Sequence, residues 1–397
     1  MIHARREVVV VSSVRTAIGG YGGALKDVSP SELAAQVVRE AVKRARIDSE
    51  QVGVLVLGNV IHTEAKDMYI ARVACINGGL PQETSALIVN RLCGSGMQAI
   101  ISAAQSITLG DTDVAVGGGA ESMSRGGYLL PSLRWGQRMN EATAIDMMVG
   151  ALTDPFDTTH MGITAENIAA QWKITREDQD AFAVESHRRA LHAIKQGYFK
   201  EQILPIELKT RKGTTVFDAD EHPRADVSLE SMAKLRAVFK KDGSVTAGNA
   251  SGINDGAAAV VLMEQAAAAK QGLQPMARLV SYGMAGVDPK IMGIGPVQAS
   301  TRALEKAGLK VADMDVIESN EAFAVQALAV ACDLKLDPRK TNPNGGAVAL
   351  GHPVGATGAI LTVKALYELQ RIDGRYALVT MCIGGGQGIA AIFERLH

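Results

Sequence analysis

The stretches AVKRARIDSEQVGVLVLGN at residues 41–59 and ALEKAGLKVADMDVIESN at residues 303–320 share one order of features. Each predicts a helix, a short loop with an acidic turn, a strand and then an asparagine, Asn59 in the first stretch and Asn320 in the second. A unit that recurs at a fixed distance is the signature of an internal repeat. The sequence therefore predicts two related halves of the same α/β design.

Other segments follow the repeat. The offset between the two asparagines brings Cys93 to within one residue of Gly355, and a slightly larger offset aligns the glycines at 117–119 with those at 384–386. Between the halves, residues 125–250 are more polar and lack the rhythm of strand and helix. This middle segment is expected to be an insertion that lies over the site.

Short apolar runs alternate with longer helical patterns, which is typical of a parallel, doubly wound sheet. One helix face is predicted from the i, i+3, i+4, i+7 spacing of Met97, Ile100, Ile101 and Ala104. Strands are expected at residues 7–13, 54–57, 86–89, 114–116, 316–318 and 376–381.

Composition limits the class of protein. The chain has 397 residues, 47% hydrophobic and 21% charged, which favours a globular α/β enzyme with more than one domain. Its formal net charge of -1 gives no basic field to attract nucleic acid or an anionic membrane surface. No apolar run approaches the roughly 20 residues of a membrane span, and the N-terminal run is too short for a secretory signal, so a cytoplasmic location is expected.

The four cysteines lie far apart, without paired spacing or histidine clusters, so neither a disulfide framework nor a zinc site is indicated. Cys75 and Cys332 fall in apolar helical patterns and are expected in the core. Cys93, in NRLCGSG, and Cys382, in MCIGGGQG, each stand where an apolar strand gives way to glycines. Both could be inert buried thiols, or they could belong to a site that handles thioesters.

Cys93 precedes the helix GSGMQAIISAAQ, where free backbone N–H groups and the helix dipole are expected to lower the pKa of its thiol. His352, in GHPVGATG, is held in a loop by Pro353 and glycines, and it could act as the base for a thiol or be structural. Asn320 follows a strand, where its amide could stabilise an oxyanion or cap the next helix.

Six segments appear in the order that the thiolase family shows. They are VNRLCGSG, GGAESMS, VTAGNASGINDGAA, NEAFA, NPNGGAVALGHPVGATG and CIGGGQGIA, and the resemblance runs from Glu7 to the C-terminus. Within this family the chain is most similar to bacterial beta-ketothiolases of the acetyl-CoA acetyltransferase type. The resemblance implies a thiolase fold with two βαβαβαββ halves in a five-layered αβαβα body and an inserted loop domain that binds coenzyme A.

The resemblance also implies boundaries and partners. The N-terminal half would span residues 1–124 and be completed by 251–275, the loop domain 125–250, and the C-terminal half 276–397. Acyl-CoA substrates and a homodimer or homotetramer are implied, without a metal or redox cofactor, since coenzyme A takes part as a substrate.

Residue roles follow by position. Cys93 matches the acylated nucleophile, His352 its base, and Cys382 the acid and base that moves the alpha proton. Asn320, through a water, matches the partner of His352 in one oxyanion hole, and the N–H groups of Cys93 and Gly384 match the second.

Coenzyme A contacts are implied for four residues, Arg224, Ser251, His160 and Met161. Lys209, Arg211, Lys212 and Arg224 form basic clusters that could attract its phosphates, although charged loops are more often merely solvated.

The expected reaction is the reversible Claisen condensation of an acyl-CoA with acetyl-CoA to a 3-ketoacyl-CoA. One alternative is a degradative thiolase for longer 3-ketoacyl-CoA chains, because residues 127–159 leave the acyl length open. Ketoacyl synthases use histidines where CIGGG has Cys382, and a non-catalytic acyl-CoA carrier would lose the thiols, so both are less favoured.

Overall fold

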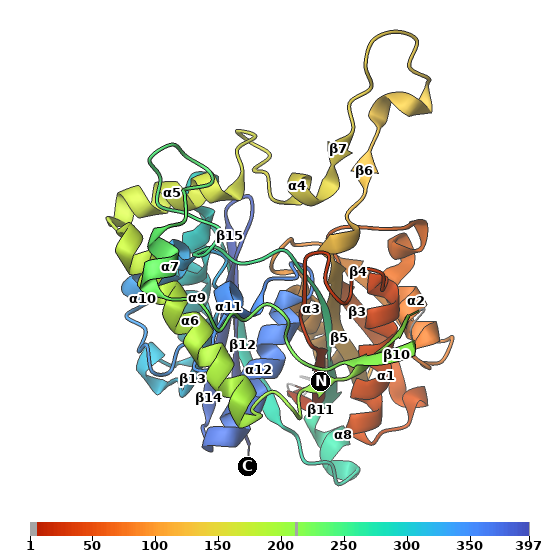
Figure 1. Ribbon diagram of the computed structural model, residues 1–397. Coiled ribbons are helices and arrows are strands. Elements are labelled where there is room, and N and C mark those ends of the chain that lie inside the picture. Colours follow the sequence, from red (N-terminus) through yellow and green to blue (C-terminus); the bar gives the residue numbers. More distant parts are fainter. Residues whose placement is uncertain (1–5, 211–212, 397) are drawn as a thin grey trace.

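The computed structural model describes residues 6–210 and 213–396. Within them an 11-stranded sheet follows the order β13-β14-β15-β12-β1-β11-β5-β3-β4, with β2 and β8 paired beside this path (Figure 1). Its strands are β1 (Val8–Thr16), β2 (Gly19–Gly20), β3 (Val52–Gly58), β4 (Ser85–Val89), β5 (Val114–Ser122), β8 (Ile203–Leu204), β11 (Asn254–Glu264), β12 (Ala277–Gly286), β13 (Val316–Ser319), β14 (Tyr376–Ile383) and β15 (Gln387–Glu394).

The two ends of this sheet repeat one topology. In the N-terminal half β3 runs parallel to β5, and β11 runs antiparallel to both β5 and β1. In the C-terminal half β13 runs parallel to β14, and β15 runs antiparallel to both β14 and β12. Antiparallel pairing of β1 with β12, through Val9 and Arg278, joins the halves. The prediction of two related halves is confirmed. The alignment of glycines 117–119 with 384–386 is wrong, because the strand registers place Gly119 of β5 opposite Gly58 and Thr380 of β14 opposite Ser319, so that residues 117–119 correspond to 378–380.

The parallel pairing expected from the alternation of strands and helices occurs for β3 with β4 and β5 and for β13 with β14, whereas β11, β12 and β15 run antiparallel to their neighbours. None of these three strands is among those predicted from the sequence. Strand β11, NDGAAAVVLME, is buried along nearly its whole length and therefore shows no alternation of apolar and polar residues. Its alanines also have low strand propensity, so neither local signal marks it.

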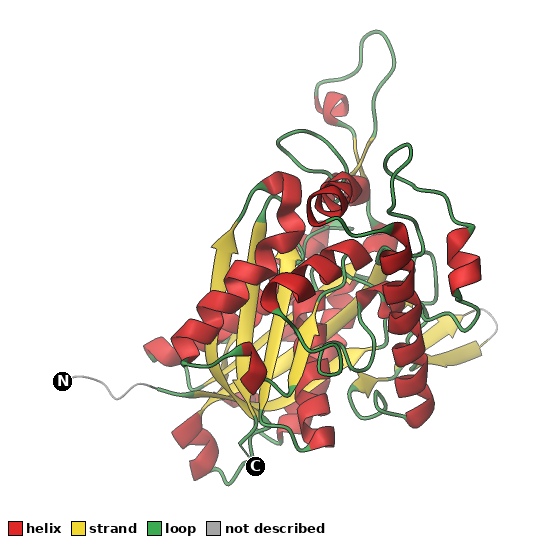
Figure 2. Cartoon of the chain, turned by 90° about the vertical axis from the view of Figure 1, so that its left-hand side faces the viewer, coloured by secondary structure: helices red, strands yellow, loops and turns green. Residues whose placement is uncertain are grey.

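Helices form three layers around the two halves of the sheet (Figures 1 and 2). Helices α1 (Pro30–Ala45) and α2 (Ile70–Asn77) pack together on the N-terminal half, and α9 (Gly295–Ala307) packs on β12 and β15 of the C-terminal half. Helices α3 (Ser95–Leu109) and α12 (Thr357–Ile372) pack on each other between the halves. The five-layered αβαβα arrangement is thus the one expected.

The central helices meet at their first turns. A Cβ atom on Gly96 of α3 would lie 2.8 Å from the backbone nitrogen of Ala359, and one on Gly358 of α12 would overlap the backbone of Met97. Glycine is required at both positions because the two backbones touch there. This contact places the loop before α3 beside the loop before α12. The predicted apolar face of α3 is confirmed, since Met97, Ile100, Ile101 and Ala104 are all buried.

Residues 125–250 contain more regular structure than their sequence suggested. Two hairpins occur there, β6 (Tyr128–Leu129) with β7 (Ile145–Asp146), and β9 (Ile206–Thr210) with β10 (Gly213–Phe217). The hairpin that carries β6 and β7 projects away from the body (Figure 2). The helices of this segment are α4 (Met147–Ala151), α5 (Met161–Trp172), α6 (Arg176–Gln196) and α7 (Leu229–Ala233).

The remaining elements are short, apart from α10 (Ala324–Leu334), which packs on α5 and α6. They are α8 (Gln265–Lys270), α11 (Ala347–Leu350) and the 3-10 turns Ser49–Gln51, Ala65–Tyr69, Met123–Arg125, Pro131–Arg134, Pro289–Ile294 and Val311–Asp313. Of the described helices, none combines the length and the apolar character needed to span a bilayer. Cys75 is buried in α2 as predicted, but Cys332 is exposed on α10, so its assignment to the core is wrong.

Candidate active site

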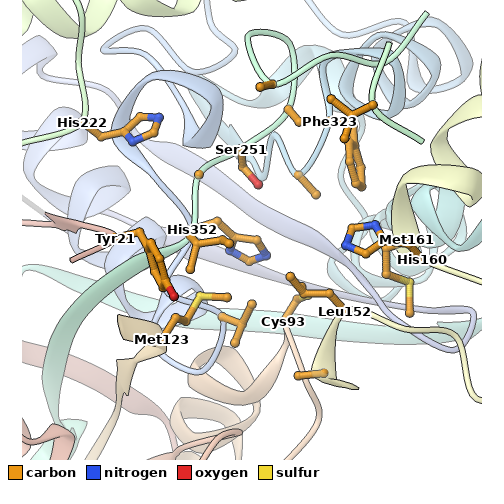
Figure 3. A pocket seen from close by; sticks show the side chains of 18 of the residues that line it. Tyr21, Cys93, Met123, Leu152, His160, Met161, His222, Ser251, Phe323 and His352 are labelled. Carbon is orange, nitrogen blue, oxygen red and sulfur yellow. The ribbon is translucent and has the colours of Figure 1, made fainter. Parts of the chain in front are cut away.

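A cavity of about 650 Å³ opens between the ends of the strands and the segment 125–250. Figure 3 shows side chains from distant parts of the chain, including Cys93 and His352, pointing into it. Both histidine and thiol therefore reach one space although they are separated by most of the sequence. Seven of the nine residues singled out from the sequence line this cavity, namely Cys93, His160, Met161, Arg224, Ser251, His352 and Gly384.

Cys93 lies in the turn between β4 and α3. Leu92 adopts a left-handed conformation with φ of 44°, and Gly94 is the N-cap of α3, so the chain reverses sharply around the half-buried thiol. Burial raises the pKa of Cys93 to about 11, although hydrogen bonds from the backbone of Gly384 and of Cys93 itself act in the opposite direction. The expected lowering of this pKa is wrong, because loss of water outweighs the nearby N–H groups. The thiol is neutral and needs a base.

His352 is held by contacts on both sides of its loop. Its backbone N–H donates to Asn254 Oδ1 at 2.9 Å, and its Nδ1 lies 2.7 Å from Thr357 Oγ1. The Thr357 hydroxyl donates its only proton to the carbonyl oxygen of Pro353 at 2.9 Å, so it must accept from Nδ1–H of His352. Nε2 is therefore the unprotonated nitrogen, and its lone pair faces the cavity and the amide Nδ2 of Asn320, which lies 3.4 Å away.

The protonation state of His352 agrees with that tautomer. Burial lowers the pKa of His352 to about 4, so the ring is neutral at physiological pH. A neutral imidazole with an unprotonated Nε2 can accept a proton from a neutral thiol. The structure therefore places an unionised thiol and an unionised imidazole in one cavity.

Asn320 lies directly behind His352. Its Nδ2 is 3.4 Å from His352 Nε2, and its backbone N–H donates to the carbonyl oxygen of Thr380 at 2.9 Å. The interpretation of Asn320 as a helix cap is wrong, because Phe323 occupies the N-cap of α10. Asn320 Oδ1 is buried without a partner among the described atoms, as an amide would be that holds a water or a substrate.

Cys382 is fully buried at the end of β14, beyond the wall of the cavity. Burial, together with the repulsion that a Cys93 thiolate would exert, raises the pKa of its thiol far above the ordinary value, so Cys382 is also neutral. The turn that follows places Gly385 and Gly386 at φ of 81° and 85°, which favours glycine and aims the N–H of Gly384 at Cys93. Cys382 and Asn320 are the two predicted residues that lie behind the lining.

The outer part of the cavity carries the residues expected to meet coenzyme A. The backbone N–H of Arg224 donates to His187 Nδ1 at 3.2 Å, and the N–H of Ser251 donates to Ala322 O at 3.0 Å. His160 caps α5 by accepting from Gly162 N–H at 3.0 Å, and burial lowers its pKa. Met161 follows at the first position of that helix.

The basic clusters are only partly at the site. Lys209 lies on strand β9 and does not line the cavity, so of the residues the structure describes in these clusters only Arg224 does. Arg211 and Lys212 lie outside the described residues. Other site residues were not predicted from the sequence, including the lining residues His222 and Phe323 and the hydrogen-bond partner of His352, Thr357. Phe323 stands in the NEAFA motif, which was the available signal.

This fold and this thiol, imidazole and N–H arrangement define an enzyme that transfers acyl groups through cysteine. The model for the thiolase N-terminal domain matches residues 8–266, and that for the thiolase C-terminal domain matches residues 273–395. The chain therefore belongs to the thiolase family and is an acyltransferase of the acetyl-CoA acetyltransferase and beta-ketothiolase type.

Individual relatives match along the whole chain. Beta-ketothiolase BktB of Cupriavidus necator is 66% identical, with 98% of this chain and 100% of the relative aligned. The crystal structure of the Bacillus anthracis acetyl-CoA acetyltransferase is 49% identical with a TM-score of 0.97, covering 99% of this chain and 100% of that one. Human mitochondrial 3-ketoacyl-CoA thiolase is 45% identical with a TM-score of 0.96, covering 98% and 99%.

Proposed function

We propose that the chain joins an acyl-CoA to acetyl-CoA, reversibly, through an acyl group carried on Cys93. The observation that supports this most directly is the set of groups around that thiol. The N–H groups of Cys93 and Gly384 are directed at its sulfur, and the neutral imidazole of His352 lines the same cavity. A thiol that is not ionised in advance depends on such a base.

In the first half-reaction, the Cys93 proton passes to His352 Nε2 while sulfur attacks the thioester carbonyl carbon. A tetrahedral oxyanion forms, held by the N–H groups of Cys93 and Gly384. Collapse breaks the bond to the coenzyme A sulfur, which takes the proton of the Cys382 thiol and leaves as free coenzyme A. The products are acyl-Cys93, an imidazolium at His352 and a thiolate at Cys382.

In the second half-reaction, the Cys382 thiolate takes an alpha proton from acetyl-CoA. Imidazolium at His352, together with a water held by Asn320, stabilises the enolate oxygen. The enolate carbon attacks acyl-Cys93, the bond to sulfur breaks, and the His352 proton returns to Cys93. Both thiols and the imidazole are then back in their starting forms, so the cycle balances with neither a metal nor a redox cofactor.

The segment 125–250 is proposed as the loop domain that binds coenzyme A, between an N-terminal half of residues 1–124 and 251–275 and a C-terminal half of residues 276–397. Its support is that His160, Met161 and Arg224 all come from this segment and line the cavity. Phosphates of coenzyme A would be met by Arg224, and the pantetheine by Ser251.

A homodimer or homotetramer and a cytoplasmic location are further proposals. The hairpin of β6 and β7 carries exposed apolar side chains, including Trp135 with an exposed fraction of 89%, and Leu87 is exposed at 51% on the edge strand β4. Apolar groups and free strand edges of this kind are typical of surfaces between protein copies. A reducing compartment keeps the reacting thiols free.

The test is Cys93→Ser, assayed for thiolysis of acetoacetyl-CoA and for binding of coenzyme A. Thiolysis is expected to vanish because an alcohol is a far weaker nucleophile at this position, while coenzyme A binds with unchanged affinity. Turnover equal to that of the parent enzyme would refute the proposal. Profiling 3-ketoacyl-CoA substrates of increasing length then measures the acyl range, including the longer chains of a degradative thiolase.

A further inference from the structure

Glu121 is a buried carboxylate that the proposed cycle does not use. It lies near the end of β5 with none of its surface exposed. Its Oε1 accepts hydrogen bonds from Asn59 Nδ2 and from Ile61 N–H, both at 3.1 Å. Its Oε2 accepts from Val60 N–H at 3.1 Å and from Gly355 N–H at 2.8 Å. Four donors therefore converge on one side chain.

These donors come from two different loops. Asn59, Val60 and Ile61 follow strand β3 of the N-terminal half, whereas Gly355 belongs to the loop of the C-terminal half that carries His352. The Glu121 side chain therefore links the two halves by hydrogen bonds. One of its donors, Gly355, lies three residues after His352 in the sequence.

The internal repeat gives Glu121 a counterpart. Strands β3 and β5 are in register at Gly58 and Gly119, and β13 and β14 at Ser319 and Thr380. Glu121 lies two residues after Gly119 on β5, and Cys382 lies two residues after Thr380 on β14. Asn59 directly follows Gly58 of β3, and Asn320 directly follows Ser319 of β13.

The same correspondence extends to the central helices. Cys93 stands two residues before the first residue of α3, and Gly355 stands two residues before the first residue of α12. The trio of Asn320, Cys382 and Cys93 at the active site thus has a twin in Asn59, Glu121 and Gly355. In this second trio, the carboxylate of Glu121 accepts a hydrogen bond from the backbone N–H of Gly355, at the position that corresponds to Cys93 in the active site.

Packing around Gly355 leaves the loop little freedom. A Cβ atom on Gly58 would lie 2.7 Å from Gly355 O and 2.6 Å from the carbonyl carbon of Ser95, which follows Cys93 closely in sequence. A Cβ atom on Gly355 itself would lie 2.5 Å from Glu121 Oε2. The carbonyl side of Gly355 is therefore packed toward the Cys93 loop, while its N–H side is fixed by Glu121.

We propose that Glu121 is a positioning residue for catalysis, which sets the His352 loop at the right distance from Cys93 by holding Gly355 N–H and the residues after β3 together. This inference rests on the proposed function, in which His352 is the base for Cys93. All four contacts of the carboxyl are hydrogen bonds that it accepts, so a proton on it would find no acceptor there, and the geometry favours the anion. Burial acts in the opposite direction and raises its pKa to about 8, although the N–H groups of Ile61, Gly355 and Val60 oppose that rise. The positioning role rests on the four hydrogen bonds.

Glu121→Gln tests the proposal because it keeps the shape but replaces one accepting oxygen by a donating NH₂. That NH₂ must face two N–H donors, so one half of the contact set is lost. We expect the rate of Cys93 acylation by acetoacetyl-CoA, followed by mass spectrometry, to fall about 10- to 100-fold, since small displacements of a base are costly. The KM for coenzyme A is expected to stay within about twofold, because the loop domain is untouched.

Glu394→Gln is the matched control. Glu394 is a buried carboxylate that accepts from Arg278 and Arg375 at the end of β15, away from the cavity lining. It is expected to lose folding stability while Cys93 acylation proceeds at the parent rate. Acylation of Glu121→Gln at the parent rate would overturn the positioning role, whereas a parent enzyme that never acylates Cys93 would overturn the proposed function instead.

Should Glu121→Gln not fold, Asn59→Ala removes one of the four donors and leaves the carboxylate in place. Its acylation rate is expected to fall at least about threefold at unchanged KM for coenzyme A, as expected for loss of one buried hydrogen bond. An unchanged acylation rate in this variant would equally overturn the inference.

Discussion

Thr357 Oγ1 accepts a hydrogen bond from His352 Nδ1 at 2.7 Å, and this contact decides which nitrogen of the ring faces the cavity. A general base must present a lone pair, and the Thr357 hydroxyl is already committed as a donor to Pro353. Helix α12, which follows the His352 loop, therefore supplies in its first residue, Thr357, the group that orients the imidazole ring.

Thr357→Val removes that acceptor while keeping the shape of the side chain. The ring of His352 then loses its tautomer preference, and kcat for thiolysis is expected to fall about 10-fold or more, by analogy with other orienting groups. Steady-state kinetics with acetoacetyl-CoA measure this. Thr357→Ser retains the hydroxyl and is expected to recover most of the rate, and equal losses in both variants would show that the methyl group matters rather than the hydrogen bond.

Cys382→Ser separates the two half-reactions. The Cys93 nucleophile and its base are intact in this variant, and coenzyme A can leave as a thiolate without the proton of Cys382, so acyl-Cys93 is expected to form and to be seen by mass spectrometry. Condensation of two acetyl-CoA molecules is expected to be lost, because a serine alkoxide is inaccessible as a base for the alpha proton. If acylation disappeared as well, Cys382 would have no separate role in the second step.

The buried neutral His352 links stability to pH. Its pKa is lowered to about 4 from the ordinary histidine value of about 6.5, so between these values the unfolded chain binds a proton that the folded protein does not. The free energy of unfolding must therefore fall as pH falls from about 6.5 to about 4, by at most about 3 kcal/mol from this group. His187, with a pKa lowered to about 4, adds a loss of the same sign.

Urea unfolding of the parent and of His352→Asn at several pH values between 4 and 7 checks this. The variant is expected to show a shallower decline because one of the histidines with a lowered pKa no longer titrates. Parallel pH profiles for the two proteins would mean that His352 is not a neutral buried base.

The projecting hairpin is expected to contact another copy of the chain. Trp135→Ser removes its most exposed aromatic side chain, and light scattering is expected to show a smaller assembly. Leu109→Ser, at the end of α3 and 80% exposed, is the matched control and should keep the parent mass. A parent mass in Trp135→Ser would place the contact elsewhere.

The internal repeat and most of the parallel strands could be predicted from the sequence, because Asn59 and Asn320 end apolar runs of similar form. The antiparallel strands escaped, since β11 and β15 are buried on both faces and show no period of two. Cys93 and His352 could be singled out from the sequence because each stands in an unusually glycine-rich segment.

Other features of the site had no local signal. Glu121 is linked to Gly355 over 234 positions, and nothing near either residue announces the bond. The raised pKa of Cys93 was also missed, because the helix terminus is visible in the sequence and the burial that outweighs it is not. Such properties depend on the whole fold.

The contact of α3 with α12 at Gly96 and Gly358 has a consequence for how the enzyme could be divided. In the proposed cycle, the attacking sulfur of Cys93 comes from one half, and the imidazole, the amide and the second sulfur come from the other. A polypeptide severed between β11 and β12 would yield two inert fragments. Enzyme activity recovered on mixing the two fragments would measure how correctly the contact between the halves had formed again.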